Sequence, residues 1–197
     1  MNSTQTAIGY KLTDKNMRTY NGFQWTLGKT IRTSGDGELC SSGWLHYYEH
    51  ELLAILHNSI HANIKNARLF KAEIGLAVVK RDNGMKSGTT EMTLVSEIPL
   101  QDITSEHRVR YAIGCAILVY KDISFRTWAD NWIDNVDRTR SAAESAAESA
   151  ARSAVWSAAS AAWSAAWSAA WSAAVLIRIA EWAVSMESLA ELEHRLA

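Results

Sequence analysis

Histidine is the residue type whose spacing suggests chemistry in this chain. Four histidines follow one another in the first half of the sequence: His46, His50, His57 and His61. On one unbroken helix these side chains would fall within about 60° of each other. His57 and His61 have the i,i+4 spacing of a two-histidine metal pair. A half-exposed polar helix flank is the simpler interpretation, so we expect no metal and retain these two as the candidate pair.

Cys40 is the other side chain with possible reactivity. A lone cysteine acts as a nucleophile only where a base and an oxyanion-binding group converge on it, and we expect a packing role for this one. Gly28, Lys29 and Thr30 lack the other residues of a phosphate-binding P-loop. Because no catalytic constellation is complete, we expect no cofactor and favour a protein that is not an enzyme.

A mixed α/β region over residues 1–121 must position these side chains. Short strands broken by turns are predicted before Cys40, and the turn Asp82-Asn83-Gly84 separates two further apolar runs that are typical of a hairpin. Residues 43–64 have helical spacing, and their apolar side consists of Leu52, Leu53, Leu56, Ile60 and Ile64. The apolar run over residues 108–121 is compatible with either a strand or a buried helix.

A helical region over residues 122–197 follows. It contains no glycine and no proline, and alanine, the best helix former, dominates it. We therefore predict one or two long helices here, and an α+β fold class for the whole chain.

A Ser-Ala-Ala-x repeat fills the centre of the helical region. A strict four-residue repeat drifts about 40° per unit around a helix, and a single three-residue step between Ser157 and Ser160 swings the stripe back by about 60°. One sector about 80° wide then holds most of the indoles of this region, with Trp182 at its edge. The set is Trp156, Trp163, Trp167, Trp171 and Trp182.

Such an aromatic ridge would promote aggregation if it stayed in water, so it must pack against a partner. We expect self-association through this helix, with burial inside the same chain as the alternative. Membrane insertion is a third interpretation, because no charged residue lies between Ser153 and Ile177. The stretch is mostly alanine and serine, however, and its tryptophans lie mid-span rather than at the ends.

Charge and cysteine content narrow the function classes. The net charge is −1, so a basic excess for nonspecific nucleic-acid binding is missing. The two cysteines are too few for a disulfide framework or a zinc ribbon. The first residues lack the pattern of a secretory signal, and we expect a cytoplasmic location.

The segments GFQWTLGKT and ELCSSGWLH resemble an uncharacterised domain of tailed-phage and prophage genomes. The matching positions are Gly22, Phe23, Gln24, Trp25, Gly28, Lys29, Thr30, Leu39, Cys40, Gly43, Trp44 and His46. The chain departs from that pattern by inserting Leu45 before the histidine, and the resemblance extends over residues 21–79. The repeat is also similar to the tails of small phage proteins. The resemblance implies a phage accessory protein acting in the host bacterial cytoplasm.

Our first hypothesis is a non-enzymatic binding and assembly protein that inhibits host defence. It would act on a host protein or sequester a small nucleotide-like ligand, multimerised by the tryptophan helix. The candidate ligand-binding residues are Phe23, Trp25, Lys29, Cys40, Trp44, His46 and Tyr48. The alternatives are an enzyme acting on nucleotides or ADP-ribose, and a virion or membrane-associated lysis component.

Overall fold

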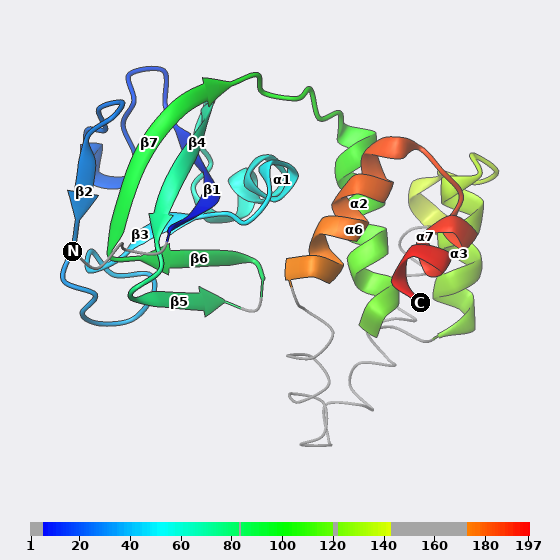
Figure 1. Ribbon diagram of the computed structural model, residues 1–197. Helices are drawn as coiled ribbons and strands as arrows, with labels where there is room; N and C mark the ends of the chain where they lie inside the picture. Colours follow the sequence, from blue (N-terminus) through cyan, green and yellow to red (C-terminus); the bar gives the residue numbers. More distant parts are fainter. Residues whose placement is uncertain (1–5, 83, 120–121, 143–172) are drawn as a thin grey trace. The chain divides into compact units, whose positions relative to one another are not determined.

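The computed structural model describes residues 6–82, 84–119, 122–142 and 173–197 (Figure 1). The chain divides into two compact units, a sheet-rich unit over Met1–Asp102 and a helical unit over Ile103–Ala197. The fold is α+β, as predicted. The boundary between the units lies before the expected position at residue 121, because the apolar run whose type was open is a helix and packs with the helical unit.

The main sheet of the sheet-rich unit has the strand order β1-β4-β7-β2. Its strands are β1 (Thr6–Thr13), β2 (Thr30–Arg32), β4 (Arg68–Gly75) and β7 (Glu91–Ile98), and all neighbours are antiparallel. Along β4, Phe70, Ala72 and Ile74 are buried while Lys71 and Glu73 are exposed. This alternation places one face of the strand in the core and the other in solvent.

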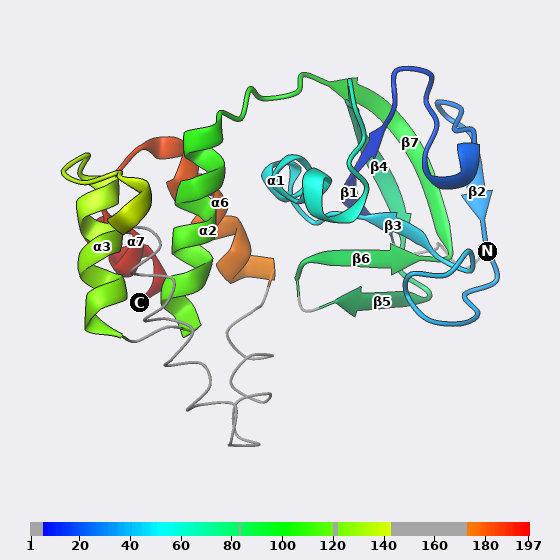
Figure 2. The ribbon, with the colours of Figure 1, turned by 180° about the vertical axis from the view of Figure 1, so that it is seen from behind.

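A second sheet has the order β3-β6-β5 and runs across the first in both views (Figures 1 and 2). Its strands are β3 (Leu45–Tyr47), β5 (Val79–Asp82) and β6 (Lys86–Thr89). β5 and β6 pair antiparallel, as in the hairpin predicted around Asp82, and Asn83 of the predicted turn lies outside the described residues. Two backbone hydrogen bonds between Tyr10 and Tyr48, of 2.8 and 2.9 Å, join the end of β3 to β1.

Helix α1 (Glu51–His61) lies beside β1 in both ribbon views (Figures 1 and 2). It begins later than expected because His50 has extended backbone angles and its ring nitrogen caps the helix by accepting from the Leu52 amide. The prediction that His46, His50, His57 and His61 share one helix is therefore wrong. The predicted apolar side is buried at Leu52, Leu53 and Leu56, but Ile60 is 65% exposed.

The helical unit contains α2 (Ser105–Val119), α3 (Ile123–Ile133), α6 (Ala173–Ser185) and α7 (Leu189–Leu196). α2 and α6 pack side by side (Figures 1 and 2). A Cβ atom on Gly114 of α2 would lie 2.5 Å from the Ile179 side chain of α6, so a larger residue at this position would force the packing to shift. None of the described helices is both long and apolar enough to cross a lipid bilayer.

Trp182 is a core residue of the helical unit, which corrects its assignment to the self-association surface and agrees with the alternative of burial within the same chain. Its ring is 0% exposed, its indole N–H donates to the Ser188 carbonyl at 2.8 Å, and the Arg110 guanidinium lies 4.4 Å from the ring centroid. A ring enclosed by its own chain has no surface left for a partner. The other members of the predicted ridge, Trp156, Trp163, Trp167 and Trp171, lie outside the described residues.

Candidate functional site

A cavity of about 670 Å³ lies within the sheet-rich unit. This volume falls in the range of small-molecule sites. Two lysines, two histidines and five aromatic residues contribute to its wall, together with smaller polar and apolar groups. The lining residues are Lys11, Leu12, Thr19, Tyr20, Asn21, Phe23, Trp25, Thr33, Cys40, Ser41, Ser42, Trp44, Leu45, His46, Tyr48, Asn58, His61, Ala62, Ile64 and Lys86.

One wall is the loop between β1 and β2, which includes the short 3₁₀ turn η1 (Tyr20–Gly22). Trp25 fixes this loop, because its indole N–H donates to the Thr19 hydroxyl at 3.0 Å and its backbone amide donates to the Met17 carbonyl at 2.8 Å. Phe23 packs edge-on against Trp25, with ring centroids 5.3 Å apart. Tyr20 stays 88% exposed at the rim. The loop thus presents aromatic surface to the cavity from a braced backbone.

The loop before β3, which carries Cys40 and Trp44, forms another part of the wall. The Trp44 indole N–H donates to the Gly37 carbonyl at 3.1 Å and so closes the loop on itself. Gly43 is required within it, because a Cβ atom there would lie 2.2 Å from the Asp36 carbonyl oxygen. Backbone atoms cannot move aside as a flexible side chain can, so this loop tolerates no larger residue at Gly43.

Lys11 is the most unusual group in the cavity wall. It is half-buried on β1, and its ammonium donates to the His46 carbonyl at 2.6 Å and lies 5.3 Å from the centroid of the Trp25 ring. No carboxylate among the described residues pairs with it. Desolvation by the surrounding protein lowers the pKa of Lys11 to about 8. The amine therefore loses its proton far more readily than an exposed lysine does.

A second cation, Lys86, lies on the same cavity wall. Its ammonium lies 3.1 Å from the Cys40 sulfur. The His46 ring contacts the Leu39 carbonyl through Nε2, and the pKa of His46 is lowered by desolvation and, to a lesser degree, by the positive charges of Lys11 and Lys86. The field inside the cavity is therefore positive at neutral pH, which favours a negatively charged ligand.

Tyr48 and His61 form a hydrogen-bonded pair at the α1 side of the cavity. Burial lowers the pKa of His61 to about 4, and the positive charge of Lys86 adds to this effect. Burial also raises the pKa of the Tyr48 hydroxyl. Tyr48 is therefore the donor and His61 Nδ1 the acceptor, at 3.0 Å. Behind them, His57 Nδ1 donates to the Met85 carbonyl at 3.0 Å, and desolvation lowers the pKa of His57 as well.

These lowered pKa values predict an acid-sensitive sheet-rich unit. The unfolded chain, with histidine pKa values near 6.5, binds more protons than the folded chain between pH 6.5 and about pH 4, so stability falls as the pH drops through this window. His61 is partly exposed, so we expect it to contribute only about 1–2 kcal/mol of this loss. His61→Gln should flatten the dependence of the free energy of unfolding on pH, measured by urea denaturation.

His194→Gln is the matched control for this experiment, because His194 is exposed on α7. The control should keep the acid sensitivity of the wild type. Equal acid sensitivity in the wild type and His61→Gln would show that the Tyr48–His61 pair has no part in it.

The structure brings together six of the seven candidate ligand-binding residues in this one cavity. The six are Phe23, Trp25, Cys40, Trp44, His46 and Tyr48. Lys29, the seventh candidate, is not among the residues that line the cavity. Lys11 and Lys86 were missed, because isolated lysines on strands carry no motif, and His61 was considered only as a metal ligand.

The candidate metal pair has no third ligand among the described residues. The His57 and His61 rings meet edge-on with centroids 5.4 Å apart, and each has a ring nitrogen engaged as described above. Over the described ranges, no three side chains of the metal-ligating types come together.

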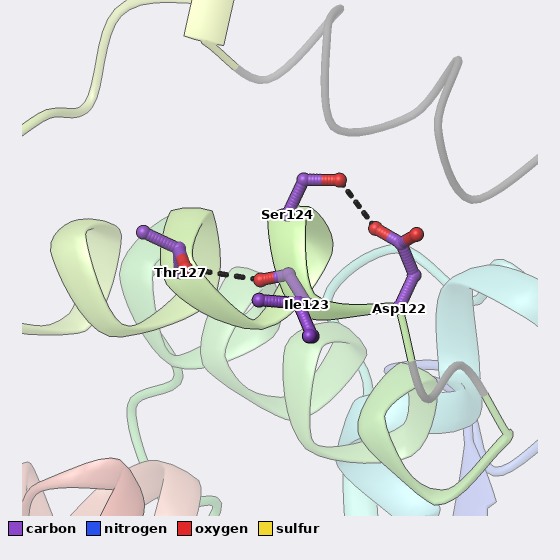
Figure 3. Close-up of a pocket in the computed structure, with 4 residues that line it drawn as sticks. All are labelled: Asp122, Ile123, Ser124 and Thr127. Carbon is purple, nitrogen blue, oxygen red and sulfur yellow. Dashed lines mark hydrogen bonds between the residues drawn. The ribbon is translucent and has the colours of Figure 1, made fainter.

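A second depression lies at the start of α3 in the helical unit, lined by Asp122, Ile123, Ser124 and Thr127 (Figure 3). The Ser124 hydroxyl donates to the Asp122 carboxylate at 2.5 Å, and the Thr127 hydroxyl donates to the Ile123 carbonyl at 2.9 Å. The same carboxylate accepts from the Phe125 amide at 2.9 Å. These are the bonds of an ordinary helix N-cap, so the depression carries no functional argument.

Comparison with known families places the cavity in a recognised domain. Residues 7–106 match the model of a family described as a domain of unknown function, DUF7666. The chain belongs to this family. The matched range of the DUF7666 domain contains every residue that lines the cavity. No curated protein and no solved structure matched the chain.

Proposed function

We propose that the DUF7666 domain of this chain binds a small ligand that combines a planar ring with a negative charge, as a nucleotide does, and holds it without converting it. One observation carries this proposal. The cavity has walls of aromatic rings and two lysines, and none of the described residues that line it is acidic.

The aromatic walls suit a planar ring. Phe23 is 41% exposed and Tyr20 is 88% exposed, and both rings line the cavity from the loop between β1 and β2. Trp25 and Trp44 are buried, and their indole hydrogen bonds brace the two loops that carry the lining residues. A planar ligand ring would therefore stack on the exposed Phe23 and Tyr20 rings, which a braced backbone carries.

The charges suit an anion. Lys11 is half-buried, and none of the described residues gives its desolvated charge a carboxylate partner. An anionic ligand group would supply the missing partner, and Lys86 adds a second positive charge to the same wall. Binding of the anionic group would then recover part of the free energy that the fold loses by desolvating the Lys11 charge.

The histidines favour binding over catalysis. His61 accepts from Tyr48, and its pKa of about 4 leaves it neutral and a weak base at neutral pH. The His46 ring is engaged with the Leu39 carbonyl. Neither ring is poised to take a proton from a substrate.

We extend this proposal to the whole chain as a phage accessory protein in the host cytoplasm. The segments that resemble the phage domain include Phe23, Trp25, Cys40 and Trp44, which are cavity residues. Sequestering a nucleotide signal would inhibit a host defence that depends on that signal. Multimerisation by the tryptophan repeat, which lies outside the described residues, would multiply the binding sites.

One observation favours the alternative of an enzyme acting on nucleotides or ADP-ribose. Cys40, whose sulfur is a potential nucleophile, lines the cavity, and the Lys86 ammonium lies 3.1 Å from that sulfur. Turnover of the ligand would be the signature of this alternative.

Calorimetric titration tests the proposal with the four nucleoside 5′-monophosphates, ADP-ribose and the matching nucleosides. We expect at least one phosphorylated compound to bind the wild type, and to bind Lys11→Met at least about tenfold more weakly. Lys71→Met is the matched control, because Lys71 is exposed on the neighbouring strand β4. Chromatography of the titrated mixture should recover the compound unchanged. Absence of binding by every compound, or equal binding by Lys11→Met, would reject the proposal, and conversion would select the enzyme.

A further inference from the structure

We propose that Lys11 forms a covalent imine with an aldehyde that carries a phosphate or carboxylate group. This inference deepens the proposed function and rests on the cavity being the ligand site. It assigns a chemical class to the ligand and a reactive atom to the protein.

The position of the amine supports this assignment. Lys11 lines the cavity from β1, and its Nζ donates to the His46 carbonyl at 2.6 Å. That carbonyl belongs to β3, where His46 pairs with Gly88 of β6, so the acceptor is fixed in a sheet. A neutral amine that donates one hydrogen to this carbonyl keeps its lone pair for another partner. The nucleophile is thereby oriented before any ligand arrives.

The surroundings of the amine favour its neutral form. The described residues supply no carboxylate to hold the proton, and the nearby Trp25 ring offers only a weak attraction for the charge. Desolvation dominates and lowers the pKa of Lys11 to about 8. About a quarter of the Lys11 side chains are then neutral near pH 7.5, against about 0.1% for a lysine with the ordinary pKa of 10.5.

The proposed step balances without an oxidant or reductant. The lone pair of Lys11 Nζ attacks the aldehyde carbon, a C–N bond forms, and one of the two amine protons is transferred to the former carbonyl oxygen to give a carbinolamine. The second proton of the nitrogen is transferred to the hydroxyl through solvent, the C–O bond breaks and water leaves as the C=N bond forms. Hydrolysis reverses the step, so the ligand is held covalently but reversibly.

Lys86 explains why the aldehyde should be charged. Its ammonium lines the same cavity, and the charges of both lysines act on the ring of His46. Once Lys11 is consumed as a neutral nucleophile, Lys86 remains to attract a phosphate or carboxylate on the same ligand. A neutral aldehyde would forgo this attraction.

Trapping with pyridoxal 5′-phosphate tests the inference in the full chain. The wild type is treated with limiting reagent near pH 7.5, the imine is reduced with borohydride, and the modified lysines are mapped by peptide mass spectrometry. We expect Lys11 to be labelled at least about tenfold faster than the exposed Lys71 in the same sample, because far more of it is neutral. Pyridoxal without the phosphate should label Lys11 more slowly.

The outcome that overturns the inference is labelling of Lys11 no faster than Lys71. The comparison within one wild-type sample avoids any variant that fails to fold, and Lys11→Arg serves only to confirm the assignment of the labelled peptide. Nucleotide binding by calorimetry without selective labelling would reject the imine and keep the proposed function. Selective labelling without nucleotide binding would keep the imine and reject the nucleotide-like ligand.

Discussion

Lys11→Met is expected to stabilise the ligand-free sheet-rich unit while it weakens ligand binding. The lysine charge is desolvated in the folded chain, which lowers its pKa from 10.5 to about 8. Methionine is also unbranched and of similar length, and it places no charge in the cavity wall. We expect a gain of about 1–3 kcal/mol in the free energy of unfolding near pH 7.

The dependence of the free energy of unfolding on pH is a second test of this prediction. Between pH 8 and pH 10.5 the unfolded chain binds more protons at Lys11 than the folded chain does. The wild type should therefore gain stability as the pH rises through this window, relative to Lys11→Met. Urea denaturation at several pH values measures the difference, with Lys71→Met as the control that should follow the wild type.

A loss of stability in Lys11→Met at neutral pH would contradict this account of Lys11. It would show that the hydrogen bond to the His46 carbonyl and the contact with the Trp25 ring outweigh the desolvation of the charge. Lys11 would then be a structural residue, and the argument for an uncompensated cation waiting for an anion would fail.

Trp182→Ala is expected to cost about 3–5 kcal/mol of stability in the helical unit, the usual range for truncating a buried aromatic residue. The ring is fully buried, and its removal also deprives the buried Arg110 guanidinium of its cation–π partner. Hydrogen exchange followed by mass spectrometry reports the effect separately for each unit. Amides of α2 and α6 should lose protection, while those of the main sheet keep it.

Ile123→Ala is the control for the helical unit, because Ile123 is 83% exposed at the start of α3. It should change stability by no more than about 0.5 kcal/mol. Unchanged protection in Trp182→Ala would show that this ring is not a core element, and would reopen its assignment to an intermolecular ridge.

The sequence predicted the fold class but not the start of α1. Leu52, Leu53 and Leu56 gave the helical period, and they are buried. The same helical period also covers His46. In the structure, however, His46 belongs to β3, which pairs with β6 and is therefore a strand. Tertiary hydrogen bonding therefore overrode the local pattern, as it often does for short segments.

The cavity was predicted in part because aromatic residues carry a strong signal and isolated lysines do not. Phe23, Trp25 and Trp44 lie in two glycine-containing segments, and both segments contribute to the wall of the cavity. Lys11 lies on β1 opposite Phe70 of β4, and nothing in its local sequence shows that its amine becomes desolvated. Desolvation depends on loops that are distant in the sequence, so it emerges only in three dimensions.

Trp182 shows the limit of periodicity as evidence. Its spacing continues the aromatic sector of the repeat, but α6 packs on α2 within one chain and encloses the ring. A helical period says which residues share a face, whereas the neighbour of that face depends on the rest of the fold.

Mass spectrometry of small molecules released from the purified protein tests the central claim most directly. We predict that denaturing the wild type and Lys71→Met releases the same anionic compound with a planar ring, in an amount approaching one molecule per chain, and that Lys11→Met releases far less. Equal amounts from all three proteins, or a neutral compound without a ring, would contradict the account of the cavity.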